Sequence, residues 1–288
     1  MKVVVTGANG QLGSDVVAVF AARGHTVASA THDVFDVKDP ARCREYLARE
    51  APQLVVNTAA MHQVDHCETN PLEAFAVNAV GARNLAVLSN ELGFTLAHIS
   101  TDYVFDGAKH APYVETDVPR PLNAYGNSKY AGDIFVNTIA GRYFIVRVSA
   151  LFGHAPCRAK GGMNFPQLML HLAKTRGSVR VVTDEMVSPT FTRDAAEQIE
   201  VLCGTRRYGT YHCTSEGACS WHEFAHKVFE LTATQVTLEA AAPNEFPAKV
   251  PRPKYSVLEN AALKAMGKNV MPHWSDALKR YLGAPVLA

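Results

Sequence analysis

Three glycines near the start of the chain constrain its fold more than any other feature of the 288 residues. They are Gly7, Gly10 and Gly13, and they separate the apolar run at 2–5 from a periodic apolar segment at 16–20. The order is therefore strand, tight turn and helix. Glycine lets the backbone approach a pyrophosphate closely, and a helix N-terminus favours its negative charge. The spacing G-x-x-G-x-x-G predicts a dinucleotide-binding turn, with a bare strand-to-helix turn as the alternative.

Strand-like and helix-like segments alternate through roughly the first 150 residues. We expect helices over residues 40–50 and from Pro71 to Leu92, the second with Leu72 and Phe75 on its buried side. The strand-like runs lie at residues 2–5, 24–30, 54–60, 96–100 and 144–149. This alternation predicts an α/β protein with a Rossmann-type, doubly wound parallel sheet. The remaining residues are expected to form a smaller α/β lobe.

Composition excludes several classes of protein. The chain is 48% hydrophobic and 19% charged, and its net charge of +1 gives no electrostatic case for binding nucleic acid or an anionic membrane. No apolar run approaches the ~20 residues needed to span a bilayer. Met1 and Lys2 lead directly into a strand-like run rather than a signal peptide. We therefore expect a cytoplasmic protein without a nucleic-acid or membrane partner.

Tyr125 and Lys129 are spaced i, i+4, which places both side chains on one face of a helix. An ammonium beside a phenol favours the ionised phenol, so we expect the pKa of Tyr125 to be lowered. Thr101 adds a hydroxyl at the end of a strand-like run. The spacing alone also fits a half-buried tyrosine and a solvated lysine. Together with the glycine turn, it predicts proton transfer to or from a carbonyl or alcohol.

Three further positions leave alternatives open or bear on the cofactor. His32 and Asp33 follow the second strand-like run, which matches neither the acidic pattern for NAD nor the basic pattern for NADP. Asn78 is a polar residue inside a helix, either bonded locally or supporting the active-site helix. The small residues Ala59 and Ala60 would let a cofactor lie close to the backbone.

The six cysteines are scattered and are expected to be free thiols in a reducing compartment. One cluster, His212, Cys213, Cys219 and His222, has ligands that could suit zinc. However, neighbouring residues of a strand face opposite ways, and His222 is expected inside a helix. We therefore expect no metal site.

The chain resembles the dTDP-4-dehydrorhamnose reductase family, within the extended short-chain dehydrogenase/reductase superfamily, over nearly its whole length. The segments that carry the resemblance are 6–13, 57–60, 64–68, 100–107, 125–129, 184–190, 251–253 and Leu258. The chain departs from the family pattern at Ala150, where tryptophan is common, at Val187, where glycine is common, and at His32, where arginine is frequent.

The resemblance implies that NADPH or NADH reduces the C4 keto group of a dTDP-4-keto-6-deoxysugar, with dTDP-4-dehydrorhamnose converted to dTDP-L-rhamnose. It implies that Tyr125 is the general acid, that Thr101 polarises the carbonyl, and that Lys129 lowers the Tyr125 pKa and holds the nicotinamide ribose. The implied cofactor contacts are Gly7, Asn9, Gly10, Gln11, Leu12, Gly13, Asp36, Val37, Ala59, Ala60, Tyr125 and Lys129. The implied substrate contacts are Val64, Thr101, Asp102, Tyr103, Asn164 and Arg252.

The expected dinucleotide-binding domain comprises residues 1–153 and about 184–212, and the substrate-binding lobe comprises about 154–183 and 213–288. Two other functions remain open for such a chain. One is an epimerase or a reductase acting on another nucleotide sugar. The other is a non-catalytic regulatory subunit resembling the methionine adenosyltransferase beta subunit. The resemblance also leaves a homodimer open.

Overall fold

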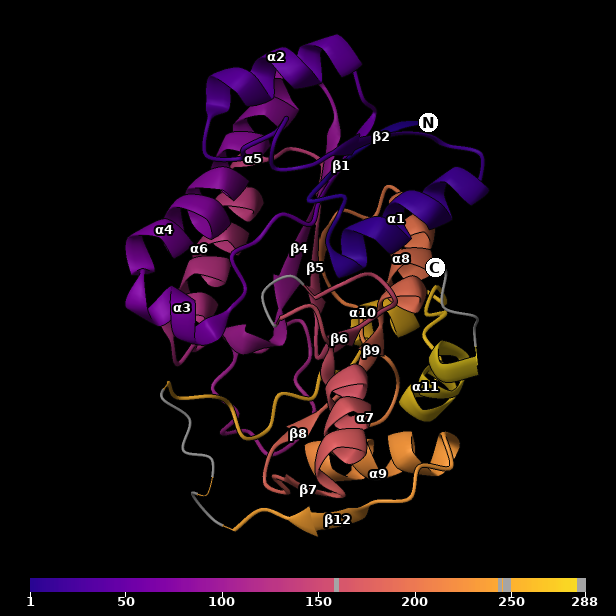
Figure 1. The fold of residues 1–288 in the computed structure, drawn as a ribbon. Coiled ribbons are helices and arrows are strands. Elements are labelled where there is room, and N and C mark those ends of the chain that lie inside the picture. Colours follow the sequence, from indigo (N-terminus) through magenta and orange to yellow (C-terminus); the bar gives the residue numbers. More distant parts are fainter. Residues whose placement is uncertain (158–160, 243–244, 246–249, 284–288) are drawn as a thin grey trace.

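A computed structural model describes residues 1–157, 161–242, 245 and 250–283 (Figure 1). Its centre is a six-stranded parallel sheet in the order β10-β5-β4-β3-β1-β2. The strands are β1 Lys2–Thr6, β2 Thr26–Ala30, β3 Leu54–Asn57, β4 Thr95–Thr101, β5 Tyr143–Val148 and β10 Gly209–His212. Val3, Val4 and Val5 are fully buried, as expected of a central strand covered on both faces. The predicted doubly wound sheet is confirmed.

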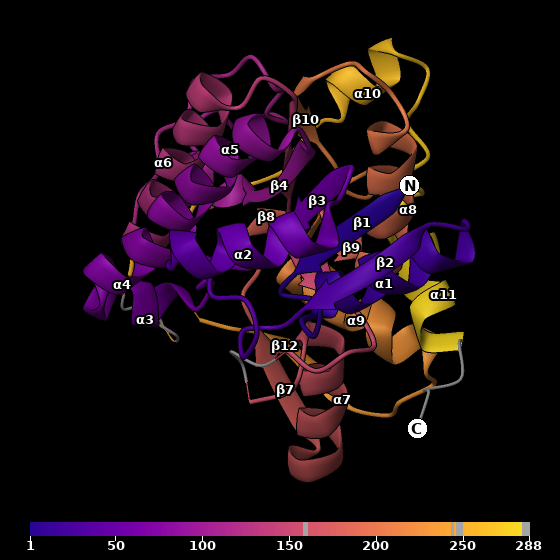
Figure 2. The same ribbon diagram turned by 90° about the horizontal axis from the view of Figure 1, so that it is seen from above.

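Helices cover both faces of this sheet (Figure 2). One face carries α1 Gln11–Ala22 and α8 Thr192–Cys203, and their apolar side chains share one core cluster with β1, β4 and β5. The other face carries α2 Pro40–Glu50, α5 Gly81–Leu92 and α6 Ala124–Ile139, which form a second cluster. The Asp39 carboxylate accepts bonds from the Ala41 and Arg42 N–H groups, so α2 begins where Asp39 and Pro40 predict.

The helix predicted from Pro71 to Leu92 is interrupted by a π-helical turn, η1 Ala76–Val80. The preceding pieces are α3 Val64–Thr69 and α4 Pro71–Phe75. A π turn adds a residue to one helical turn, so positions before it are rotated relative to α5. The expectation that Leu72 and Phe75 would be buried is consequently wrong, and their side chains are 88% and 38% exposed.

A smaller group of elements lies below the sheet in Figure 1 and has its own aromatic-rich core. Its helices α7 and α9 each begin with a capping box, formed by Asn164 and Ser220. The elements are β6 Leu151–Phe152, α7 Phe165–Arg176, β7 Ser178–Val181, β8 Met186–Val187, β9 Thr190–Phe191, β11 Cys219–Ser220, α9 Trp221–Leu231, β12 Thr237–Ala240 and α11 Trp274–Gly283. We call this group the lobe.

The chain crosses between the sheet and the lobe more than once. The short helix α10 Ala261–Ala265 carries Leu263, which packs with Met271 in the core of the sheet rather than in that of the lobe. The exact boundaries between the two predicted domains stay a prediction.

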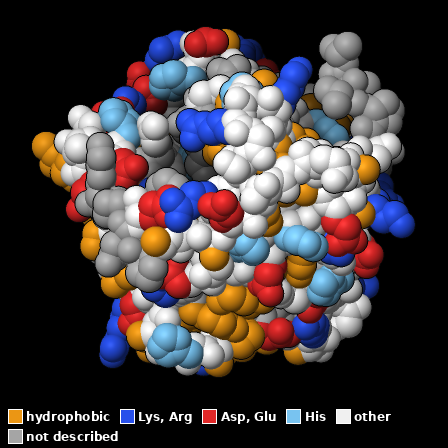
Figure 3. All heavy atoms as spheres, turned by 60° about the horizontal axis from the view of Figure 1, so that its bottom comes forward, with side chains coloured by type: hydrophobic (Ala, Val, Ile, Leu, Met, Phe, Trp, Pro, Cys, Tyr) orange, Lys and Arg blue, Asp and Glu red, His pale blue; other side chains and the backbone are white. Residues whose placement is uncertain are grey.

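The surface shown in Figure 3 carries acidic and basic side chains side by side, with apolar side chains gathered in its lower half. Among the described residues, no helix is both long and apolar enough to cross a membrane. All six cysteines are free thiols, as expected.

The close approach of α6 to the π turn yields a test of packing. A Cβ on Gly132 would lie 2.4 Å from the Asn78 carbonyl oxygen, so Gly132→Ala must push two backbones apart. We expect this change to lower the free energy of unfolding by about 1–3 kcal/mol in chemical denaturation. Gly204→Ala is the control, because its nearest neighbour would be the Val201 carbonyl oxygen at 3.4 Å. Equal losses in both variants would contradict this account of the packing.

Candidate active site

The glycine turn has the shape that a pyrophosphate requires. Gly7 has a φ of +64°, and a Cβ there would lie 2.9 Å from the Ala59 amide nitrogen. A Cβ on Gly13 would lie 2.2 Å from the Gly7 carbonyl oxygen, so position 13 in the first turn of α1 tolerates no side chain. The residue that precedes α1 is Gly10, and it offers no side-chain cap. The first N–H groups of α1 therefore have no capping side chain, and the turn fits a dinucleotide.

Other predicted cofactor residues lie around this turn. Thr58 follows β3 and donates its hydroxyl to the carbonyl oxygen of Thr6 at 2.6 Å, which ties the ends of β1 and β3 together. Ala59 and Ala60 come next and are partly exposed, as is Asn9 within the turn. Gln11 donates its side-chain amide to the Gly153 carbonyl oxygen at 3.2 Å.

The side chains of three predicted cofactor residues contact other parts of the protein. Leu12 is buried in the core of the sheet. Val37 is buried against Gly81, where an added Cβ would lie 2.6 Å from the valine Cγ2. Asp36 accepts a hydrogen bond from the Lys38 N–H group at 3.0 Å. Because Asp36 is partly exposed, it alone of the three has a side chain that a ligand can reach.

Thr101 and Tyr125 come together at the carboxyl end of β4, where open α/β sheets bind their ligands. The Thr101 hydroxyl lies within hydrogen-bonding range of the Tyr125 phenol. Tyr103 packs edge-to-face on Tyr125, with ring centroids 5.7 Å apart. Burial raises the pKa of Tyr125, and the nearby Asp102 carboxylate raises it further. The expected lowering of this pKa is wrong, because loss of water around the phenol raises it and the largest opposing effect comes from Thr101 rather than from the Lys129 ammonium.

The Lys129 ammonium is held by β4 and is only 2% exposed. It donates to the Ile99 carbonyl oxygen at 2.6 Å and lies 3.4 Å from His98 Nε2. Burial lowers the pKa of Lys129 to about 8 and that of His98 well below its ordinary value. Lys129 therefore anchors α6 to β4, which in turn places Tyr125 beside Thr101.

Asn78 supports the same helix from the π turn and is 1% exposed. Its side chain bonds both the N–H and the carbonyl of Met61, each at 2.9 Å. It also donates to the Ser128 hydroxyl at 3.0 Å, and Ser128 donates to the Tyr125 carbonyl oxygen at 2.8 Å. Of the two alternatives left open by the sequence, the structure shows that Asn78 supports α6, the helix that carries Tyr125.

The predicted substrate residues differ in how accessible their side chains are. Val64 is partly exposed at the start of α3, and the adjacent Asp65 carboxylate lies 3.5 Å from the Arg252 guanidinium. Asn164 is buried, and its amide donates to the Gly153 carbonyl oxygen and the Tyr281 hydroxyl at 2.7 and 3.1 Å. With both amide protons used in this way, Asn164 is a structural residue in this conformation.

Sequence reasoning missed a buried polar chain beneath the site. The Thr6 hydroxyl bonds Asn57 at 2.6 Å, and Asn57 bonds His98 Nδ1 at 3.1 Å. A buried ion pair belongs to the same region: Arg147 Nε lies 3.2 Å from the Asp133 carboxylate. The only signal in the sequence was the i, i+4 spacing of Lys129 and Asp133 on one helix face.

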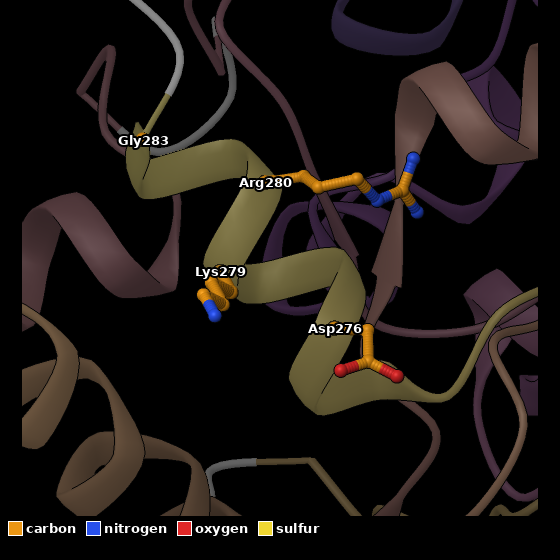
Figure 4. A pocket seen from close by; sticks show the side chains of 4 residues that line it. All are labelled: Asp276, Lys279, Arg280 and Gly283. Atoms are coloured by element: carbon orange, nitrogen blue, oxygen red, sulfur yellow. The ribbon is translucent and has the colours of Figure 1, made fainter.

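The hollow at α11 and the surroundings of His212 are weaker candidates for a binding site. A hollow of about 570 Å³ lies against α11 and is lined by Asp276, Lys279, Arg280 and Gly283 (Figure 4). Arg280 reaches away from Lys279 and pairs with Asp194 at 2.7 Å, so its charge is already compensated. The His212 ring bonds two backbone carbonyl oxygens at 3.1 Å. No group of three or more potential metal ligands forms in the described part of the chain.

The glycine turn, the parallel sheet and the Thr101, Tyr125 and Lys129 set at its carboxyl edge define a class, the extended short-chain dehydrogenases/reductases. A family model described as "RmlD substrate binding domain" matches residues 1–285, and the chain belongs to this family.

Two curated relatives and one solved structure illustrate the similarity. The spore coat polysaccharide biosynthesis protein SpsK of Bacillus subtilis (strain 168) is 38% identical, covering 98% of this chain and 96% of its own. A dTDP-4-keto-6-deoxy-D-glucose reductase of Streptomyces niveus is 36% identical, covering 96% of this chain and 94% of its own. The crystal structure of the Bacillus anthracis dTDP-4-dehydrorhamnose reductase in complex with NADP is 38% identical, with a TM-score of 0.92 and 98% of each chain covered.

The pKa of Lys129 predicts how stability depends on pH. The folded protein loses the Lys129 proton near pH 8, whereas the unfolded chain keeps it to about pH 10.5. Stability should therefore rise between these values, because the unfolded state binds more protons. Relative to Lys129→Met, the wild type should gain up to about 3 kcal/mol from pH 7 to pH 10.5. Denaturant titrations of both proteins across this range measure the difference, and a difference independent of pH would contradict the assignment.

Proposed function

We propose that this chain reduces the C4 keto group of a dTDP-4-keto-6-deoxysugar with NADPH or NADH, converting dTDP-4-dehydrorhamnose to dTDP-L-rhamnose. The observation that carries the proposal is that the Tyr125 phenol meets the Thr101 hydroxyl at the carboxyl end of β4, in the sheet whose strand β1 leads into the glycine turn. The names of the Streptomyces and Bacillus anthracis relatives support the substrate class, and the NADP complex supports the cofactor.

The raised pKa of Tyr125 suits the direction of this reaction. When bound, the reduced nicotinamide supplies the hydride to C4. The developing alkoxide then needs a proton, and a buried phenol that stays protonated at neutral pH is ready to donate one. We assign Tyr125 as the general acid and Thr101 as its hydrogen-bond partner. Lys129 holds α6 in place, and the family resemblance assigns it to the nicotinamide ribose.

The substrate is proposed to lie between α3 and the segment that carries Arg252. The ion pair between Arg252 and Asp65 is 3.5 Å long, and both side chains are at least one-third exposed. Such a pair is weak, so Arg252 can turn to the diphosphate of a nucleotide sugar at little cost. Val64 and Tyr103 would border the sugar. The lobe is proposed to bind the nucleotide sugar.

A cytoplasmic location and a homodimer complete the proposal. Exposed apolar side chains on α4, the π turn and α6 support self-association, since a partner would cover them. They are Leu72, Phe75, Val80 and Ile134.

An absorbance assay of NADPH and NADH against a panel of dTDP- and UDP-4-keto sugars tests the function. We expect oxidation of the reduced cofactor that depends on a dTDP-4-keto-6-deoxysugar, with an equimolar 4-hydroxy sugar formed. An epimerase would consume no reduced cofactor overall. A regulatory subunit would oxidise none with any sugar, and either of these results would refute the proposal.

Replacing the Tyr125 phenol tests the assigned general acid. Tyr125→Phe should lower kcat by a factor of about 100 or more, because the alkoxide loses its positioned proton donor. Cofactor affinity, measured by NADPH fluorescence, should change little. Tyr130→Phe on the same helix is the matched control and should keep normal turnover. Near-normal turnover in Tyr125→Phe would remove Tyr125 from the mechanism.

A further inference from the structure

Asp102 was expected to contact the substrate, but its side chain is buried and only 4% exposed. One carboxylate oxygen accepts the Thr101 hydroxyl at 3.0 Å, and the other accepts the Ser149 hydroxyl at 2.8 Å. The Ser256 hydroxyl bonds the same carboxylate. Three hydroxyl donors thus converge on Asp102 from β4, from the end of β5 and from the C-terminal part of the chain. Burial raises the pKa of the Asp102 carboxyl, and these donors oppose that rise by stabilising the ionised carboxylate.

In its ionised form, Asp102 fixes the direction of neighbouring hydrogen bonds. An ionised carboxylate only accepts, so the single proton of the Thr101 hydroxyl must point to it. The Thr101 oxygen also accepts the Tyr103 N–H group at 3.2 Å. With its proton on Asp102, the Thr101 oxygen can only accept from Tyr125, so the phenol would be the donor between the two. A Thr101 hydroxyl oriented this way has no proton left to offer a substrate carbonyl.

Ser256 connects this cluster to the segment that carries Arg252. The Ser256 N–H group donates to the Met186 carbonyl at 2.9 Å, and the Met186 N–H group donates to the Lys254 carbonyl at 2.8 Å. The Asn123 side chain, which caps the Tyr125 helix, donates to the Pro251 carbonyl oxygen at 2.9 Å. The segment is thus seated against both β8 and α6, close to the catalytic hydroxyls.

We propose that Asp102 is a positioning residue rather than a substrate contact: it orients the Thr101 hydroxyl so that Tyr125 is held as a donor. Through Ser256, Asp102 also couples this orientation to the seating of the segment that carries Arg252. The kinetic part of this inference rests on the proposed reductase function.

A double-mutant cycle on kcat tests the inference with the full chain, NADPH and the dTDP-4-keto sugar. Asp102→Asn should lower kcat by up to about 100-fold, as misplaced catalytic groups do, while the KM for the sugar changes little. In a Thr101→Ala background the same change should cost less than about threefold, because Asp102 acts through Thr101. An equal loss in both backgrounds, or a raised KM with unchanged kcat, would overturn the inference.

Two further variants control for a general effect of removing a carboxylate and for a failure of Asp102→Asn to fold. Asp106→Asn is the matched control, since Asp106 also accepts a hydroxyl, that of Tyr113 at 2.8 Å, but makes no bond to Thr101. It should leave kcat unchanged. If Asp102→Asn fails to fold, Ser256→Ala carries the test and should lower kcat about threefold or more only when Thr101 is present. No effect of Ser256→Ala in either background would overturn the coupling to the segment.

Neutron diffraction from the deuterated protein decides the hydrogen-bond direction without any turnover. The Thr101 deuterium should lie between its oxygen and Asp102, and the Tyr125 deuterium should point to Thr101. A Thr101 deuterium directed at Tyr125 would overturn the inference, whatever the protein reduces. A wild type inactive on every sugar would instead refute the proposed function.

Discussion

The hydrogen bond from the Lys129 ammonium to the Ile99 carbonyl fixes the geometry on which the site depends. It joins α6 to β4 in a place from which water is excluded, so the helix has little freedom to slide along the strand. Asn78 holds the other side of α6 through Met61 and Ser128. Because Tyr125 is on α6 and Thr101 is at the end of β4, these contacts determine how closely the two hydroxyls meet.

Burial gives these residues their chemical character. Away from water, the pKa of Tyr125 rises and that of Lys129 falls to about 8, so both neutral forms are favoured. A phenol with a raised pKa stays protonated at neutral pH, and it can therefore give its proton to the strongly basic alkoxide that forms when a ketone is reduced. Loss of water at this site therefore keeps the phenol in the protonated form that the reduction requires.

The fold was predictable from the sequence because its signals are local. The glycine turn sits between a strand and a helix, and both of its close contacts demand glycine. The alternation of buried strands with helices predicts the parallel sheet, which is confirmed. The segments that resemble the dTDP-4-dehydrorhamnose reductase family also led to the correct family.

The parts that could not be predicted depend on contacts between distant segments. Nothing in residues 71–92 reveals the π turn that follows Leu72, because its contacts with α6, such as that of Asn78 with Ser128, involve a distant segment. Asp102 looked like a substrate contact because the sequence does not show that Ser149 and Ser256 reach its carboxylate. The pKa of Tyr125 was predicted in the wrong direction because the i, i+4 spacing shows a charge nearby but not the loss of water.

The most direct measurement is a crystal structure with NADPH and a non-reducible analogue of a dTDP-4-keto-6-deoxysugar. The account predicts the Tyr125 hydroxyl within hydrogen-bond distance of the sugar O4 position, about 2.6–3.2 Å, with the nicotinamide C4 facing the sugar C4. A sugar bound with O4 away from Tyr125, or a diphosphate that avoids the glycine turn, would contradict it.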